Sequence, residues 1–282
     1  MHLLGQIKPT GTVIAAVIEG ATVRPIPEHT MLDLIRRSEV QKEPLGALAK
    51  RLASRHAEEH VPVLPVTPPE VWGCGCTYQS SASFRDAEHG TKEGMYAHVY
   101  REARPEIFFK GTARVCVASG QPIGIRRDSQ FTAPEPELAV ILGSRGRIAA
   151  YTLANDVSAW DIERENALYL PQSKIYDACC ALGPVLVPAE EMPDPYALEL
   201  TCRIARGGRE IFAGTVSTGA LHRRIETLVD YLTRANHVPA GTVVLTGTGI
   251  IVPEDCALQP GDRVTVRIAE IGELVNEAAV VG

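Results

Sequence analysis

Short apolar runs with strand-like spacing recur along most of the chain, and glycine and proline separate them. One segment, 217–236, has helical spacing instead, with Ser217 or Thr218 as its candidate N-cap. This pattern predicts a β-rich region with few helices, built as a roll or barrel. The apolar positions on one face of that helix are Leu221, Ile225, Leu228, Val229 and Leu232. The predicted strands are EIFFKG (106–111), ELAVILG (137–143), RIAAYTLAND (147–156), GPVLVP (183–188), ALELTCRIA (197–205), GTVVLTG (241–247) and DRVTVRIAEIG (262–272).

The N-terminal part has a different pattern. Segments 12–20 and 21–27 read as paired strands, and 29–38 and 44–55 have helical spacing. Segment 61–69 contains four prolines and is typical of an extended linker. We therefore predict an α+β protein, with a small N-terminal α/β domain at residues 1–65 and a larger β domain at residues 66–282.

Composition restricts the class of protein. The chain has 282 residues, 45% of them hydrophobic, and a formal net charge of -6. It has no block of clustered Lys and Arg and no apolar run of membrane-spanning length, so we expect neither a nucleic-acid nor a membrane partner. The seven cysteines are odd in number and include the adjacent pair Cys179 and Cys180, which favours a reducing cytoplasm over a disulfide framework.

Three acidic residues lie at the ends of predicted strands. Glu135 and Glu137 are two residues apart, so their side chains share one side of a strand, and Asp156 ends a second apolar strand. Three carboxylates grouped in this way suit Mg²⁺ or Mn²⁺. The alternative is that the two glutamates line the solvated side of an edge strand, and their spacing alone favours that alternative.

The order of several motifs adds to this pattern. EPELAVILG, YTLANDVSAWDIE, LPQSKIYDACCALGPVLV, VVLTGTG and LQPGDRVTVRIAEIGELVN follow one another along the chain. This set resembles the fumarylacetoacetate hydrolase superfamily over nearly all of residues 66–282. The resemblance implies a mixed β-roll as the catalytic domain, Mg²⁺ (with Mn²⁺ or Ca²⁺ as substitutes) held by Glu135, Glu137 and Asp156, and an active-site lysine at Lys174.

A finer resemblance concerns the activity. The phrases RPEIFFK, EN-LYLPQ-KIY and C-LGP look like the 2-keto-3-deoxy-D-arabinonate dehydratase branch. This implies a metal-dependent hydro-lyase of sugar acid catabolism that converts a 2-keto-3-deoxy sugar acid such as 2-keto-3-deoxy-D-arabinonate to 2,5-dioxopentanoate. In that reading Lys174 and Glu106 are catalytic, and Thr248, in LTGTG, binds the substrate. Arg85 is a further candidate for contacting a substrate hydroxyl or carboxylate group, and the alternative that it is a solvated charge on one helical face with Glu88 stays open.

The chemistry explains why such residues are needed. Loss of water begins with removal of a proton from C3, and a divalent cation at the 2-keto oxygen stabilises the resulting enolate. An acid must then protonate the departing hydroxyl group. Lys174 is assigned to positioning or proton transfer and Glu106 to acid–base work, and the order in which they act stays open.

Other readings compete with this one. A C–C bond hydrolase of acylpyruvates belongs to the same superfamily, but its water-activating histidine is not found directly after Tyr78, and His89 comes later. A non-catalytic metal or sugar-acid binding protein is a third reading. A Schiff-base lysine enzyme would need strands that alternate with helices, which this chain lacks.

Three further expectations concern the surroundings of the site. Trp160 stands where the family usually has arginine, which bears on the choice of substrate. Segment 79–100 is expected to be a mobile lid. The partner is expected to be a small anionic 2-keto acid, and the chain is expected to form a cytoplasmic homodimer or homotetramer.

Overall fold

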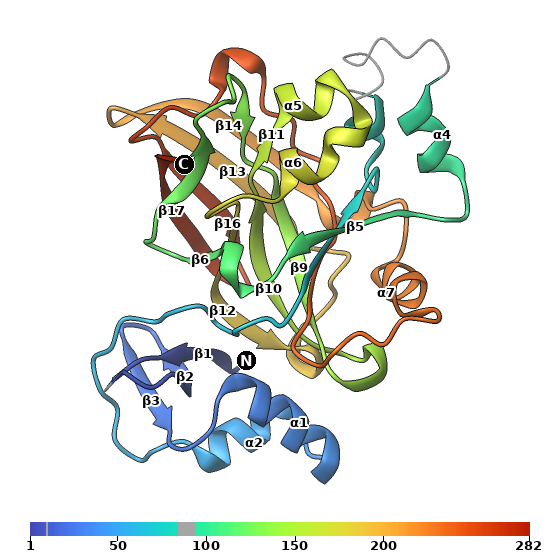
Figure 1. The fold of residues 1–282 in the computed structure, drawn as a ribbon. Helices are drawn as coiled ribbons and strands as arrows, with labels where there is room; N and C mark the ends of the chain where they lie inside the picture. The colour runs from blue at the N-terminus through green and yellow to red at the C-terminus, as the bar shows by residue number, and fades with distance from the viewer. Residues whose placement is uncertain (10, 84–93) are drawn as a thin grey trace.

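The N-terminal elements form a small group at one end of the chain. The computed structural model describes residues 1–9, 11–83 and 94–282. Figure 1 shows the N-terminal strands and helices gathered below the rest of the molecule. Segment 61–70 contains neither helix nor strand, as expected of a linker, and the domain boundary at residue 65 stays a prediction. The elements are β1 (Leu3–Ile7), β2 (Ile14–Glu19), β3 (Thr22–Ile26), α1 (Met31–Gln41) and α2 (Leu45–Leu52).

A large mixed sheet contains half of the remaining strands. Its strand order is β3-β2-β1-β12-β10-β9-β15-β4-β5, with β6 beside β12. The pairing of β1 with β12 joins the N-terminal strands to this sheet. The added strands are β4 (Val71–Gly75), β5 (Glu106–Gly111), β6 (Cys116–Ala118), β9 (Pro136–Leu142), β10 (Ile148–Asp156), β12 (Cys180–Pro188) and β15 (Val243–Leu245).

A second sheet packs against the large one. Its order is β14-β13-β16-β17-β7, and two short strands, β8 and β11, pair separately. Together these sheets form the mixed α/β architecture expected for the catalytic part. The strands are β7 (Ile123–Arg126), β8 (Thr132–Ala133), β11 (Ser158–Ala159), β13 (Glu199–Arg206), β14 (Arg209–Ser217), β16 (Arg263–Ile268) and β17 (Gly272–Val281).

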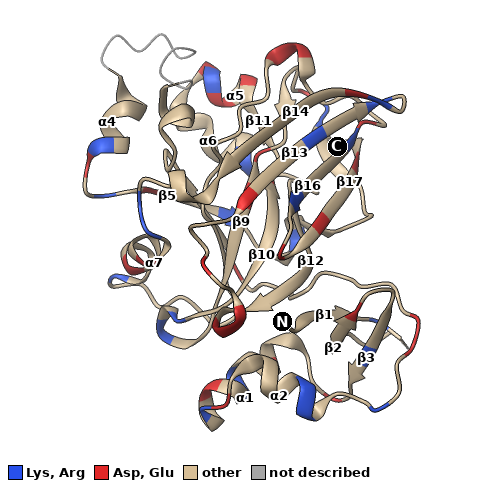
Figure 2. Cartoon of the chain, turned by 180° about the vertical axis from the view of Figure 1, so that it is seen from behind, with Lys and Arg blue, Asp and Glu red and all other residues tan. Residues whose placement is uncertain are grey.

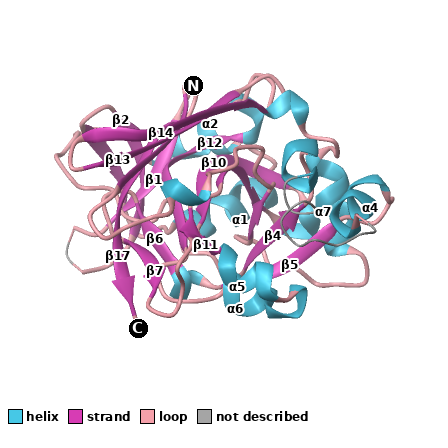
Figure 3. Cartoon of the chain, turned by 90° about the horizontal axis from the view of Figure 1, so that it is seen from above, coloured by secondary structure: helices cyan, strands magenta, loops and turns pink. Residues whose placement is uncertain are grey.

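Short helices flank the sheets. Figure 3 shows α4 and α7 together at one side of the molecule and α5 and α6 together near β11. No helix within the described ranges is both long enough and apolar enough to cross a membrane. Figure 2 shows basic and acidic residues interspersed along the elements. The helices are α4 (Met95–Arg101), α5 (Trp160–Glu165), α6 (Leu170–Lys174) and α7 (Ile225–Thr233).

The central strand β9 is covered on both faces. Every residue of PELAVIL in this strand is buried. Leu138 and Val140 enter the core between the two sheets, whereas Ala139 and Ile141 enter a second core on the opposite face. A strand with a continuous apolar run is stable in such a position because neither face meets water. The alternative that Glu135 and Glu137 belong to a solvated edge strand is therefore wrong.

The register of the strands places the ends of several neighbouring strands at the same end of the large sheet, which is called its edge below. Strand β10 runs antiparallel to both β9 and β12, and its end at Asp156 pairs with the start of β12 at Cys180. Strand β15 runs parallel to β4, so both end at this same edge. The start of β5 lies there as well, because Glu106 is paired with Gly75. Six strand ends therefore surround one small volume.

The predicted C-terminal helix is shorter than expected. Helix α7 covers Ile225–Thr233, and the chain from residue 217 to 224 is not α-helical. Thr218 exchanges hydrogen bonds with the backbone of Leu198, which ties this segment to the start of β13. Arg223 donates to the carbonyl oxygens of Val99 and Tyr100. These tertiary contacts outweigh the helical pattern, so the predicted N-cap at Ser217 or Thr218 is wrong.

Three strand assignments also change. Segment 262–272 is strand β16 followed by a turn into β17 rather than one strand. Strands β1 and β14 have no counterpart in the predicted pattern. Strand β1 contains Gly5, and β14 lies at the edge of its sheet with alternately exposed side chains, so neither presents a clear apolar run.

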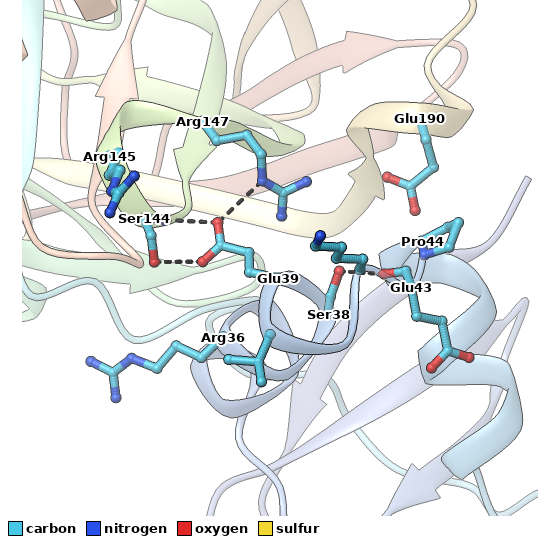
Figure 4. Close-up of a pocket in the computed structure, with 11 residues that line it drawn as sticks. Arg36, Ser38, Glu39, Glu43, Pro44, Ser144, Arg145, Arg147 and Glu190 are labelled. Atoms are coloured by element: carbon cyan, nitrogen blue, oxygen red, sulfur yellow. Dashed lines mark hydrogen bonds and ion pairs between the residues drawn. The ribbon is translucent and has the colours of Figure 1, made fainter.

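Glu39 of α1 fastens the N-terminal elements to the large sheet. Its carboxylate accepts hydrogen bonds from the backbone N–H of Ser144 (2.8 Å), the Ser144 hydroxyl (2.5 Å) and Arg147 Nε (3.1 Å). Figure 4 shows these bonds at the wall of an open groove between the two parts. Burial opposes ionisation, but the Ser144 and Arg147 contacts prevail and lower the pKa of Glu39. Glu39 therefore stabilises this contact as an anion.

We expect Glu39→Ala to reduce the free energy of unfolding by about 1–3 kcal/mol, because three hydrogen bonds to the half-buried Glu39 carboxylate are lost together. Since the pKa of Glu39 is lowered, its contribution is present above the unfolded glutamate pKa of about 4.5 and is lost as the pH falls below it. Urea unfolding at pH 7 and pH 3 measures this. Glu43→Ala is the control, because Glu43 pairs with the exposed Arg51 within the N-terminal elements. Equal stability of the two variants at pH 7 would contradict the assignment.

Candidate metal centre and active site

Three carboxylates converge where the strand ends meet. Glu135 lies directly before β9, Glu137 is the second residue of β9 and Asp156 is the last residue of β10. One oxygen from each lies within 4.8 Å of the others, and all three residues are buried, with at most 3% of their surface exposed. Asn155 supports the arrangement, because its side-chain oxygen accepts the backbone N–H of Glu135. The structure thus brings together the three predicted metal ligands.

The ionisation of Glu137 is strongly opposed by its burial and by the two neighbouring carboxylates. Burial, followed by the charges of Asp156 and Glu135, raises the pKa of its carboxyl group well above the ordinary value. The backbone N–H of Gly247, which donates to Glu137 Oε2 at 2.5 Å, and the charge of Lys174 oppose that rise. A cation between the carboxylates would favour the ionised form.

Lys174 reaches into the carboxylate cluster from the end of α6. Its Nζ lies 2.8 Å from Glu135 Oε1, 3.3 Å from Asp156 Oδ2 and 2.7 Å from the Ser158 hydroxyl. Helix α6 is held in place because the Ser173 hydroxyl donates to the carbonyl oxygen of Ala159. The predicted active-site lysine is therefore fully buried beside two of the predicted ligands.

A second buried lysine, Lys110, was not predicted. Its Nζ lies 2.5 Å from Asp156 Oδ1 and donates to the carbonyl oxygen of Val157 at 3.0 Å. Burial disfavours its charged form, but Asp156 prevails and raises the pKa of Lys110 above the ordinary lysine value. The sequence held a signal for it, because residues 106, 108 and 110 share one face of a strand. Lys110 thus lies on the face of β5 that carries Glu106.

Trp160 supplies a neutral donor to the same cluster. Its indole Nε1 donates to Glu135 Oε1 at 2.6 Å. The ring is buried at the start of α5 and packs edge-on against Phe131, with centroids 5.2 Å apart. At the position where the resemblance predicts arginine, Trp160 therefore gives Glu135 an uncharged hydrogen-bond donor.

Glycines let the β5 side chains cross the neighbouring strand. Gly73 and Gly75 of β4 face Phe108 and Glu106, and a Cβ on either glycine would collide with the opposing side chain. Glu106 consequently lies over β4, where it accepts a hydrogen bond from the thiol of Cys76 at 3.4 Å. The Phe108 ring faces Lys174, whose Nζ is 5.5 Å from the ring centroid.

The charge of Glu106 reaches the same buried region as that of Glu137. Burial raises the pKa of the Cys74 thiol well above its ordinary value, and the charges of Glu137 and Glu106 add to that rise. Both carboxylates therefore act on one thiol from opposite sides of β4. The structure places the predicted acid–base residue at the same end of the sheet as the metal-ligand cluster, on the far side of β4.

The two predicted substrate-binding residues differ in outcome. Thr248 is buried in the turn after β15, and its hydroxyl oxygen accepts the backbone N–H of Ile250 at 3.2 Å. This turn contains Gly247, which contacts Glu137 through its N–H group. Arg85 and His89 lie outside the described residues, as does segment 84–93 of the predicted lid.

The donor set suits a hard divalent cation. The three carboxylates offer oxygen ligands only, which Mg²⁺, Mn²⁺ and Ca²⁺ prefer, and the cluster includes no thiolate or imidazole ligand among the described residues. Trp160, Lys110 and the Gly247 N–H group each fix a carboxylate oxygen from a different element. Such outer contacts orient metal ligands.

Comparison with known proteins places these features in a family. The chain is 42% identical over 285 residues to 2-dehydro-3-deoxy-D-arabinonate dehydratase of Saccharolobus solfataricus, an alignment that covers 98% of this chain and 95% of the relative. It is 40% identical over 260 residues to a Haloferax volcanii protein named "Probable 2-keto-3-deoxyxylonate dehydratase", with 90% and 89% of the two chains covered.

A solved structure agrees over the whole chain. The structure of 2-keto-3-deoxy-D-arabinonate dehydratase complexed with magnesium and 2,5-dioxopentanoate aligns with a TM-score of 0.84 at 39% identity, covering 100% of this chain and 99% of the other. The family profile described as fumarylacetoacetate (FAA) hydrolase C-terminal matches residues 77–279, which include every residue of the cluster. The chain therefore belongs to the fumarylacetoacetate hydrolase family.

Proposed function

We propose that the protein is a Mg²⁺-dependent dehydratase that converts a 2-keto-3-deoxy pentonate, such as 2-keto-3-deoxy-D-arabinonate, to 2,5-dioxopentanoate. The observation that carries the proposal is the buried triad of Glu135, Glu137 and Asp156 with Lys174 bonded to two of its members. The full-length likeness to dehydratases supports the choice of reaction.

The three carboxylates would bind the cation. Buried side chains that contact the carboxylates would keep them in position. A bound divalent cation supplies positive charge for the 2-keto oxygen while the C3 proton leaves. Lys110 orients Asp156 from the side of β5. Trp160 keeps one oxygen of Glu135 in place without adding charge.

Proton transfer falls to Lys174 and Glu106. The Lys174 ammonium group is buried beside the cluster, so its proton can move only to a bound ligand or a neighbouring carboxylate. Glu106 lies across β4 from the cluster, where a carboxyl group can take the C3 proton or protonate the C4 hydroxyl group. The proposal gives these two residues the acid and base roles without fixing their order.

Substrate contacts extend to the turn after β15. Thr248 and the backbone of its turn would contact the substrate carboxylate, since glycine at 247 and 249 lets a ligand approach the backbone. Arg85 would contact a carboxylate or hydroxyl group of the substrate. C4 is the one stereocentre of a 2-keto-3-deoxy pentonate, and arabinonate and xylonate of the same series share it, so the two names among the relatives describe one kind of substrate.

The proposal includes an assembly and a compartment. We infer a homodimer or homotetramer, which is supported by exposed apolar side chains at Phe109 on the edge strand β5 and at Leu168, whose exposure is 84%. The free thiols, most of them buried, support a reducing cytoplasm. Residues 1–65 would form a separate small domain ahead of the catalytic domain at residues 66–282.

The reaction itself gives the first test. With Mg²⁺, 2-keto-3-deoxy-D-arabinonate should yield a single product that is lighter by one water, detected by mass spectrometry. Exhaustive chelation should abolish this turnover and added Mg²⁺ should restore it, because the triad alone supplies no positive charge for the keto oxygen. Cleavage of an acylpyruvate into two products, with no loss of water from the sugar acid, would identify a hydrolase instead.

Lys174→Met should lower kcat by about 10²–10⁴-fold, the usual contribution of a proton-transfer residue. Its Mg²⁺ affinity should stay equal or rise, because a positive charge next to the cation is removed. Calorimetric Mg²⁺ titration and steady-state rates on the same sample separate the two effects. Lys50→Met, on the exposed side of α2, is the control. Loss of Mg²⁺ binding together with turnover would make Lys174 a structural residue.

Trp160→Phe should weaken Mg²⁺ binding by about tenfold, because Glu135 loses a donor that orients it while the ring packing on Phe131 stays. Trp72→Phe is a matched control: the Trp72 indole donates to Glu70 at 2.9 Å, and its ring packs edge-on against Phe109. Both affinities are measured by calorimetry. Equal Mg²⁺ affinities of the two variants would show that Trp160 only fills space.

A further inference from the structure

The hydroxyl group of Thr77 is buried beside the metal-ligand cluster without a partner. Thr77 follows β4, and only 1% of its surface is exposed. Among the residues that the structure describes, its Oγ1 has no hydrogen-bond partner. Its backbone is fixed, because the carbonyl oxygen accepts the N–H of His222 at 2.9 Å. The hydroxyl group therefore stays in place although nothing in the fold uses it.

Gly247 connects this hydroxyl group to the cluster. A Cβ at position 247 would collide with Thr77 Oγ1, so the Gly247 Cα packs directly against the hydroxyl group. The N–H of the same residue donates to Glu137 Oε2. One residue thus contacts a predicted metal ligand on one side and the free hydroxyl group on the other. The turn it belongs to also contains Thr248.

A buried hydroxyl group without a hydrogen-bond partner lowers the stability of the folded protein unless a ligand supplies the partner. Burying a donor without a partner is unfavourable, and buried polar groups in folded proteins are almost always paired. The Thr152 hydroxyl group in the same sheet, equally buried, is paired in this way, because it donates to the carbonyl oxygen of Val185 at 2.7 Å. An unpaired donor next to a binding site is the arrangement expected when a ligand supplies the acceptor.

We propose that Thr77 is a substrate-binding residue whose hydroxyl group donates a hydrogen bond to the carboxylate of the 2-keto acid. The inference rests on the proposed function for its ligand. A hydroxyl donor prefers an anionic acceptor. The carboxylate is the anionic group of a 2-keto acid, and Gly247, in the turn of Thr248, lies between Thr77 and the predicted metal ligand Glu137. Thr77 thereby contributes to selection of acids over neutral ketones.

The test compares Thr77→Val, which keeps the shape and removes the hydroxyl group, with Thr77→Ser, which keeps the hydroxyl group. Pyruvate is the probe, because it has the carboxylate and keto groups and no sugar tail. Its affinity for the Mg²⁺-loaded protein is measured by calorimetry. The variant Thr77→Val should bind pyruvate about 10–100-fold more weakly, the effect of losing one hydrogen bond to a charged group. Thr77→Ser should bind it like the parent.

Two further readouts separate this role from a structural one. The Tm of ligand-free Thr77→Val should equal that of the parent or exceed it by up to about 4 °C, because an unpaired buried group is removed. The control Thr152→Val should lower Tm and leave the pyruvate affinity unchanged. With 2-keto-3-deoxy-D-arabinonate, KM of Thr77→Val should rise more than kcat falls.

Each contrary result has a definite meaning. Parental pyruvate affinity of Thr77→Val in an active enzyme overturns the inference alone. A Tm several degrees below the parent shows that the fold uses the hydroxyl group, which also overturns it. Weaker binding of the sugar acid with unchanged binding of pyruvate rejects the carboxylate as the acceptor. A parent protein that binds no 2-keto acid with Mg²⁺ overturns the proposed function and this inference together.

Discussion

Three carboxylates within 4.8 Å of one another in a buried place set the main constraint on this protein. Each buried anion costs several kcal/mol in lost hydration, and their mutual repulsion adds to that cost. The structure compensates with groups from separate elements: Lys174 from α6, Lys110 from β5 and the Trp160 indole from α5. Most of the local architecture around the sheet edge serves to bring these groups within contact of the carboxylates.

The strand order makes that convergence possible, and small residues make it close. Because β9, β10, β12, β15, β4 and β5 all present an end at one edge, no long loop is needed to gather the site. Gly73 and Gly75 leave room for the side chains of β5 to cross β4. Gly247, at a φ of +93°, adopts a backbone conformation that favours glycine and turns its N–H toward Glu137. A side chain at any of these positions would displace a group that faces the cluster.

Much of the site could be predicted from the sequence, because its members follow strand ends. The spacing of Glu135 and Glu137 and the place of Asp156 at a strand end made a metal site a candidate, and the ordered motifs of the family resemblance favoured it and added Lys174. Lys110 could have been predicted in the same way. Alternate residues of a strand share one face, so Lys110 lies on the same face as Glu106. The positions of Trp160 and Thr77 were not predictable, because their contacts join segments far apart in the chain. The predicted start of helix α7 was wrong for the same kind of reason. Contacts with backbone groups far away in the sequence fix residues 217–224, so the helix begins only after them.

The balance of charge links metal binding to substrate binding. When the three carboxylates are ionised, the two buried lysines leave one net negative charge, so the cluster itself repels an anionic acid. A divalent cation reverses the sign and leaves one net positive charge, which matches a monocarboxylate. An arginine at position 160 would already have made the cluster neutral without the cation, whereas the Trp160 indole donates its hydrogen bond and leaves the charge unchanged. Attraction of the acid therefore depends on the metal, which is a coupling free energy between the two ligands. Because such coupling is reciprocal, the acid must strengthen cation binding by the same factor by which the cation strengthens binding of the acid.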